Sequence, residues 1–107
     1  MNKILGFALS IMMVSISSNT ALADYVKDFK LIEKYQVELD AGNLNPALKY
    51  TNQVSAGAVK DSMFVHIFMK AIEMKKCLFA KPILDKYEDK SGFGIKKSME
   101  LQYQTNC

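Results

Sequence analysis

Apolar residues recur along most of this chain at intervals of three and four positions, which is the spacing of an α-helix. Between residues 24 and 42 the repeating apolar positions are Tyr25, Phe29, Ile32 and Leu39, widened by Leu31 and Tyr35. No segment shows the strict alternation of apolar and polar residues that marks a half-buried strand. The pattern therefore predicts an all-α protein.

Glycine, asparagine and proline mark the limits of the first two helices. Gly42 ends the first helix, because glycine readily adopts the left-handed dihedrals of a helix C-terminus. Asn45 and Pro46 then predict an N-cap followed by a proline at the first helical position. The second helix is expected from Pro46 to about Ser55, closed by Gly57.

The segment 61–76 is apolar around nearly its whole circumference. Its polar interruptions, His66, Lys70 and Glu73, fall at helical spacing on a single narrow stripe. A helix that is apolar nearly all round lies in the middle of a domain. We therefore expect this third helix to form the core.

A fourth helix is expected from near Phe79 or Ala80 to about Gly92. Pro82 is tolerated near its start, because the first four amide groups of a helix have no internal partner. With a fifth helix at the C-terminus, the chain is predicted to form a small bundle of about five helices. Two antiparallel helix hairpins are followed by the last helix.

The chain ends on a cysteine, and the pattern of the last helix gives that cysteine a direction. Ile95, Met99 and Tyr103 repeat every four residues, and the next step is Cys107, which should therefore point inward. Only one intramolecular pairing exists, with Cys77, and two cysteines in an oxidising compartment usually pair. We predict this disulfide; an intermolecular bond through an exposed Cys107 is the alternative.

The N-terminal segment has the three parts of a secretory signal peptide. A short basic stretch ending at Lys3 precedes an uncharged, mostly apolar run over residues 4–16, and a small-x-small pattern ends at Ala23. The apolar run is short for a bilayer, which needs roughly 20 apolar residues. We predict cleavage between Ala23 and Asp24. The remaining residues 24–107 are expected to be a single soluble helical domain in the periplasm, or secreted, without a stable membrane anchor.

The basic residues argue against a nucleic-acid partner. All 14 are lysine, against 11 acidic residues. Arginine supplies the bidentate contacts to phosphate and to guanine, so its absence weakens any nucleic-acid role, and export weakens that role further.

An internal similarity appears when residues 28–54 are placed over residues 61–87, at an offset of 33. The aligned pairs include Leu31 with Phe64, Tyr35 with Phe68, Leu39 with Ile72 and Ala47 with Ala80. Together with "AGNLNPALKY", this pattern resembles the tetratricopeptide or Sel1-like helical hairpin over residues 28–90. The resemblance implies stacked hairpins whose inner helices line a shared concave surface. Two antiparallel helix pairs that share a generic apolar pattern are the alternative.

Candidate groups for catalysis or metal binding are few. His66 is the only histidine, and no nucleophile-elbow motif accompanies it. A zinc site needs three or four ligands, which one histidine plus carboxylates would have to supply if both cysteines are oxidised. We therefore expect no metal, no cofactor and no enzyme activity, and we interpret the stripe of His66 as a solvent-facing edge.

By elimination, the sequence favours a small exported protein that acts by binding an unidentified envelope or secreted protein. One hypothesis is an inhibitor or immunity protein of an envelope-acting toxin. The alternatives are an accessory or killing-related factor of a conjugation or secretion apparatus, and a small cell-wall or peptide hydrolase. A homodimer is also compatible with the sequence.

The repeat resemblance implies where such a partner would bind. The inner helices of the two hairpins would line one surface, so the expected binding positions are Lys30, Lys34 and Glu38 of the first helix beside His66 and Lys70 of the third.

Overall fold

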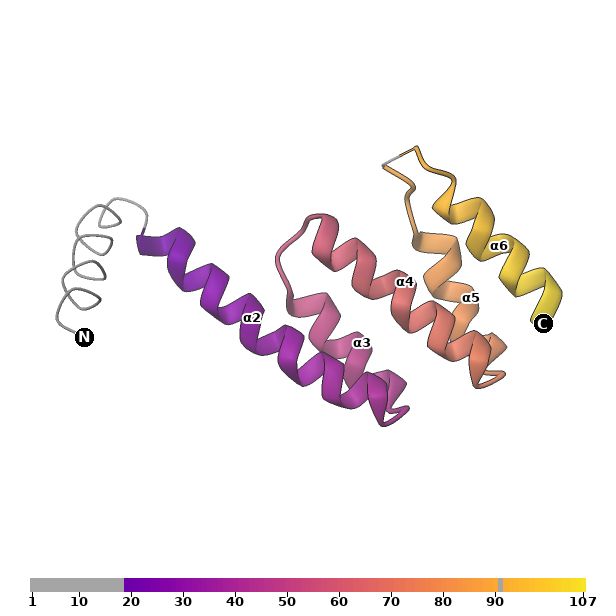
Figure 1. Cartoon of the computed structure of the whole chain (residues 1–107), viewed down its shortest axis with the longest axis horizontal. Helices are drawn as coiled ribbons and strands as arrows, with labels where there is room; N and C mark the ends of the chain where they lie inside the picture. Colours follow the sequence, from indigo (N-terminus) through magenta and orange to yellow (C-terminus); the bar gives the residue numbers. More distant parts are fainter. Residues whose placement is uncertain (1–18, 91) are drawn as a thin grey trace, which may run out of the picture.

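A computed structural model of the chain describes residues 19–90 and 92–107. These residues form five helices and no strand: α2 (Asn19–Asp40), α3 (Leu44–Gln53), α4 (Ala58–Glu73), α5 (Cys77–Lys86) and α6 (Ile95–Asn106). The prediction of an all-α fold, with two helix hairpins and a C-terminal helix, is confirmed (Figure 1).

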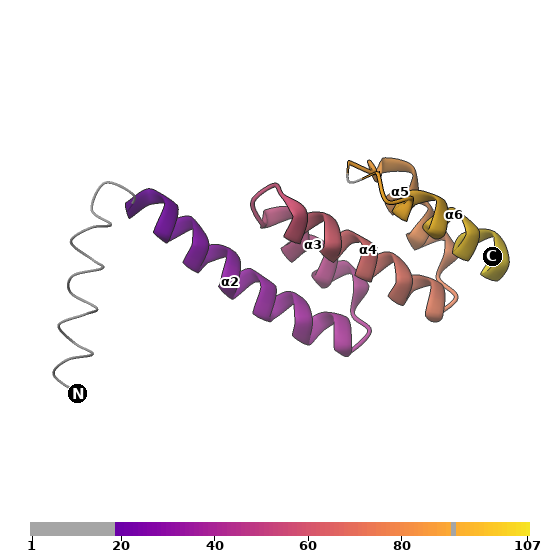
Figure 2. The ribbon, with the colours of Figure 1, turned by 45° about the horizontal axis from the view of Figure 1, so that its top comes forward.

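The helices are arranged in two layers. Helices α2, α4 and α6 run in the same direction in one layer, and α3 and α5 run the opposite way in the second layer (Figures 1 and 2). Helix α4 lies in the centre and packs against α3, α5 and α6. The chain therefore stacks hairpin α2–α3, hairpin α4–α5 and the single helix α6 in sequence order.

The predicted cleavage point between Ala23 and Asp24 falls within α2, and the apolar run that precedes it lies outside the described residues. Within the part of the chain that the structure describes, no helix is long and apolar enough to cross a membrane.

The hydrophobic core lies between the two layers. Helix α2 contributes one row of buried residues at four-residue spacing, Leu31, Tyr35 and Leu39. Tyr25 and Phe29, which the sequence pattern placed in the same apolar stripe, are 75% and 62% exposed. They are exposed because the N-terminal part of α2 extends past the end of α3 (Figure 1).

Helix α4 supplies the centre of the core, as its composition predicts. Phe68 and Ile67 are fully buried in it. The buried residues of this helix are Met63, Ile67, Phe68, Ala71 and Ile72. Their side chains spread over more than one face, because α4 has neighbours in both layers.

The turns of the two hairpins are built alike. In each turn, a residue in the left-handed conformation donates its N–H to the carbonyl three residues back at 3.0 Å. The next residue donates to the carbonyl five residues back at 2.8 Å. These left-handed residues are Gly42 (φ 79°) and Lys75 (φ 60°), 33 positions apart. The bond pair is a Schellman motif, so the 33-residue offset in the sequence extends to the backbone of both turns.

The Schellman turns also explain where the sequence misplaced helix starts. Helix α3 begins at Leu44 and not at Pro46, so the proline lies in the first turn, where a missing N–H leaves no bond unmade. Helix α5 begins at Cys77, directly after the turn at Lys75, and ends at Lys86 instead of continuing toward Gly92.

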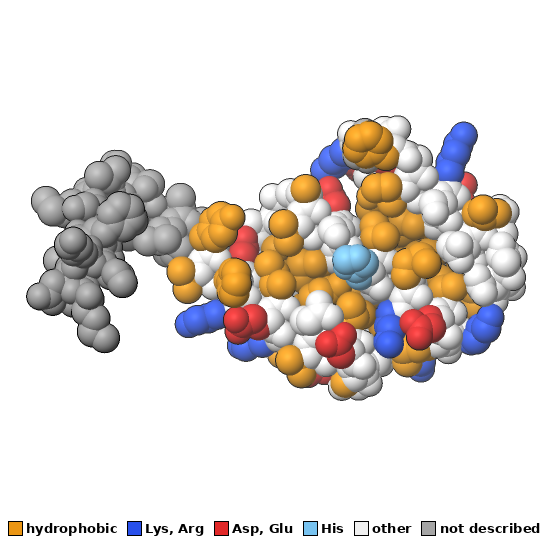
Figure 3. Space-filling view, in the orientation of Figure 1, with side chains coloured by type: hydrophobic (Ala, Val, Ile, Leu, Met, Phe, Trp, Pro, Cys, Tyr) orange, Lys and Arg blue, Asp and Glu red, His pale blue; other side chains and the backbone are white. Residues whose placement is uncertain are grey.

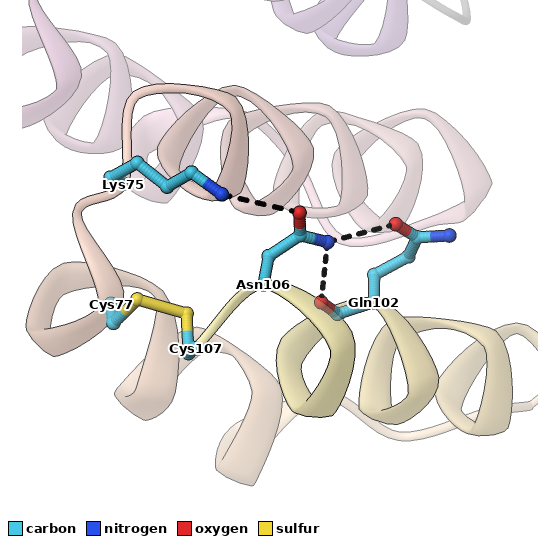
Figure 4. The surroundings of a disulfide bond; sticks show 5 residues. All are labelled: Lys75, Cys77, Gln102, Asn106 and Cys107. Atoms are coloured by element: carbon cyan, nitrogen blue, oxygen red, sulfur yellow. Dashed lines mark hydrogen bonds between the residues drawn. A yellow bond between two sulfur atoms is a disulfide. The ribbon is translucent and has the colours of Figure 1, made fainter.

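The predicted disulfide between Cys77 and Cys107 is present in the structure (Figure 4). The two Cα atoms are 6.0 Å apart and the S–S bond is 2.05 Å long. It joins the end of α6 to the start of α5. Beside it, Lys75 Nζ donates to Asn106 Oδ1 at 3.4 Å, and Asn106 Nδ2 donates to the Gln102 carbonyl at 2.9 Å. The C-terminal end of α6 is therefore tied to the second hairpin by the disulfide and by the hydrogen bond from Lys75.

Candidate functional site

Among the described residues, no group of three or more His, Cys, Asp or Glu side chains is placed to hold a metal ion. Among the displaced pKa values, those of Tyr35 and Lys81 follow from helix packing and a surface ion pair. Tyr35 is buried, its hydroxyl donates to the Met63 carbonyl at 3.4 Å, and burial raises the pKa of Tyr35 to about 12, with the charge of Asp40 adding to the shift. The hydrogen bond to Asp85, at 2.9 Å, raises the pKa of Lys81 on α5.

His66 and Lys70 lie on the side of α4 that borders α2. Together with Gln36, Asp40 and their neighbours they line a shallow cleft of about 340 Å³. His66 is exposed, and in Figure 3 its side chain lies in the middle of the face formed by α2, α4 and α6. The α2 side of this cleft is formed by Gln36, Leu39 and Asp40.

The three other predicted binding residues lie elsewhere on α2: Lys34 and Glu38 on the edge beside α3, and Lys30 with Val26 and Glu33 on the outer side. Lys34 Nζ lies 6.0 Å from the ring centre of Tyr50 in α3, and the Glu38 carboxylate accepts a hydrogen bond from Asn43 Nδ2 at 2.9 Å. Both contacts point toward α3 and the turn before it. The structure therefore does not bring these three residues beside His66 and Lys70.

A more apolar cleft, of about 390 Å³, opens between the N-terminal half of α2 and the α3–α4 connection. We call it the apolar cleft; its apolar side chains come from Tyr25, Phe29, Ile32, Val54 and Val59, with Ala56 and Ala58. Tyr25, Phe29 and Val59 are 75%, 62% and 56% exposed. In Figure 3, hydrophobic side chains gather over this part of the molecule, between the N-terminal part of α2 and the histidine.

Small residues in the connection keep the apolar cleft open. Residues 55–58 are Ser-Ala-Gly-Ala, so no large side chain fills the space beside α2. Gly57 has φ 153°, a backbone conformation that L side chains rarely adopt, and it leads directly into α4. The Ser55 N–H donates to Asp28 Oδ1 at 3.1 Å, which ties the connection to α2. The walls of the cleft are therefore held at a fixed separation.

The sequence missed this cleft for a physical reason. The periodicity identifies Tyr25 and Phe29 as apolar helix positions, but it does not show that α3 ends before it can cover them. Val54 and Val59 flank a connection that carries no recognisable motif. The one available signal is the run of small residues next to two valines.

A wider cleft of about 570 Å³ lies between the two Schellman turns, lined by residues 42–46 and 75–79. Leu78, 92% exposed, is its most exposed apolar residue. Much of its lining comes from lysine and asparagine side chains, so it offers less apolar surface for a partner than the cleft beside α2.

No protein-family model matches this chain, and neither a curated protein nor a solved structure matches it. Its function is therefore inferred from its own residues.

Proposed function

We propose that this protein is a small exported, non-enzymatic protein that acts by binding another protein through the apolar cleft. Within that class we propose an inhibitor or immunity protein of an envelope-acting toxin, working in the periplasm. A signal-like N-terminus and a disulfide support export, since disulfides persist in oxidising compartments.

The observation that carries the proposal is the exposure of two aromatic side chains at the apolar cleft. Tyr25 and Phe29 are mostly exposed and are not packed into the core. Contiguous exposed apolar surface marks sites of protein interaction, and aromatic residues dominate the binding energy of such sites. Phe29 is 62% exposed, so burying the rest of its side chain against a partner would contribute about 1–2 kcal/mol.

The apolar cleft is also suited to a rigid mode of binding. Ile32 and Val54 form its inner wall, and Val54 is only 4% exposed, so the base of the cleft is continuous with the core. The hydrogen bond from Ser55 to Asp28 engages the carboxylate that lines it. A partner would therefore insert an apolar side chain into a preformed site, which lowers the entropic cost of binding.

The test is recovery of a partner from envelope extract on immobilised protein, followed by reconstitution with the purified partner. The variant Tyr25→Ala/Phe29→Ala should lose most of the partner, because it removes the exposed aromatic rings. The matched control is Leu101→Ala on α6, which is 60% exposed and lies outside the cleft. Equal recovery by both variants, with both folded, would place the binding site elsewhere.

Export has its own test. Mass spectrometry of the chain from the periplasmic fraction should show Asp24 at the N-terminus. An intact Met1 in the membrane fraction would contradict the proposed cleavage and location.

A further inference from the structure

The side of α2 that faces away from the core carries a regular row of four residues. Val26, Lys30, Glu33 and Val37 follow one another at intervals of four, three and four, opposite the buried row of Tyr35. We call these four residues the outer row. Val26 is 49% exposed and Val37 is 67% exposed, and both charged residues are exposed. Apolar residues at both ends thus enclose two opposite charges.

The outer row lies at one end of the helix stack, and the other end is finished differently. Stacked hairpins need a polar outer face on their terminal units, because no further unit covers them. The exposed side of α6 is mostly polar, since Lys97, Glu100 and Gln104 lie on it around a single exposed leucine, Leu101. The exposed side of α2 carries valines and borders Phe29 instead. The exposed side of α2 thus places two valines among its charges, where the exposed side of α6 has one leucine.

The outer row is complementary to itself. If two copies of α2 lie antiparallel, with a two-fold axis midway between Leu31 and Ile32, Val26 faces Val37 of the second copy. In the same arrangement Lys30 faces Glu33 of the second copy, and the two-fold axis repeats each contact. Spacing of four, three and four residues is that of the facing positions in a coiled coil. Apolar residues meet apolar residues, and each charge meets its opposite.

We propose that the outer row of α2 binds a second copy of this chain and forms a two-fold symmetric dimer. The interface is isologous, so it closes at two copies and leaves the polar, disulfide-linked ends pointing outward. A single helix pair buries less than the ~800 Å² per partner of a stable complex, so the association is weak and depends on concentration.

This dimer goes beyond the proposed partner binding, because it uses a different side of α2. Tyr25 and Phe29 border both surfaces, but none of the four outer-row residues lines the apolar cleft. A two-fold axis perpendicular to the helix pair places the same edge of both helices on one side. The two apolar clefts would then open on the same face of the dimer.

The experiment is sedimentation equilibrium of the processed chain, purified from the cells that produce it, from about 1 µM to about 1 mM in low-salt buffer. The wild-type chain should show a monomer–dimer equilibrium. Lys30→Glu and Glu33→Lys should each weaken dimerisation by about tenfold or more, because each places like charges opposite one another. Lys97→Glu, on the far end of the stack, is the charge-matched control and should dimerise like the wild type.

Charge exchange distinguishes a symmetric dimer from other association. The double variant Lys30→Glu/Glu33→Lys should recover dimerisation, and an equimolar mixture of the two single variants should associate more strongly than either alone. A wild-type chain that stays monomeric up to about 1 mM would overturn the proposal and leave the outer row to a different protein. Dimers that ignore both single substitutions, or a double variant no stronger than the single ones, would also overturn it.

Discussion

The first hairpin, α2–α3, and the second, α4–α5, share the same turn but differ in how they are covered. The second hairpin has a neighbour on each side, and its long helix contributes the fully buried Phe68 and Ile67. Among the described residues, the first hairpin has a neighbour on one side only, and its long helix extends past its partner with Phe29 exposed. Two hairpins of similar pattern thus differ in role: the second forms the centre of the core, and the first also presents exposed apolar surface.

The difference shows why an apolar residue in a repeat does not have one fixed role. Position 35 of the first hairpin and position 68 of the second are aligned at the 33-residue offset, and both are buried. Position 29 has no such constraint, because nothing in the described chain covers the N-terminal part of α2. Whether a helical apolar stripe becomes core or binding surface depends on the length of the neighbouring helix.

The largest expected difference in stability between the two hairpins appears when a large side chain is removed from each. Phe68→Ala should lower the free energy of unfolding by about 3–5 kcal/mol, because it leaves a cavity in the core. Phe29→Ala should change it by about 0.5 kcal/mol or less, since the ring is already exposed. Chemical denaturation followed by circular dichroism measures both. Similar losses for the two variants would show that Phe29 belongs to the core.

The next effect concerns the disulfide that fastens the C-terminal end of the stack. Cys107→Ser should lower the free energy of unfolding by about 3–4 kcal/mol, because the bond closes a loop of 30 residues. Thiol labelling of the native wild-type chain should find no free cysteine. Two reactive thiols per chain under oxidising conditions would contradict the intramolecular pairing.

The pH dependence of stability tests whether Tyr35 of the first hairpin is buried. Burial raises the pKa of Tyr35 to about 12 from 10.0, so the folded state binds this proton more tightly than the unfolded state. Its contribution to stability is complete below pH 10 and is lost as the pH rises toward 12. Between pH 10 and pH 12, the free energy of unfolding of Tyr35→Phe should therefore fall less than that of the wild type. An identical pH dependence in both chains would show that Tyr35 titrates as an exposed tyrosine.

The smallest effect compares the two turns. Both turn residues are left-handed, but one is Gly42 and the other is Lys75. For a lysine this conformation costs about 1–2 kcal/mol. Lys75→Gly should therefore raise stability by up to about 1 kcal/mol, reduced by the loss of its hydrogen bond to Asn106. Gly42→Ala should lower stability, since its new Cβ would also lie 3.3 Å from Met74 Cε. Equal and negligible changes would show that the turns carry no strain.

The parts of the fold that follow from local pattern were predictable from the sequence. The apolar circumference of segment 61–76 indicates a central helix, and the direction of Cys107 indicates the disulfide. The candidate site was less predictable, because it depends on which edge of α2 meets α4. Lys34 faces α3 and His66 faces α2, a distinction that helical spacing alone does not make.

The central claim is that the uncovered end of the first hairpin binds a partner protein. Its most direct test is calorimetric titration of the purified partner into wild type and Phe29→Ala, with the melting temperature measured on the same samples. Loss of about 1–2 kcal/mol of apolar burial predicts an affinity that is about five- to thirtyfold weaker, with an unchanged melting temperature. An affinity within about twofold of the wild type, which corresponds to less than about 0.5 kcal/mol, would contradict the claim.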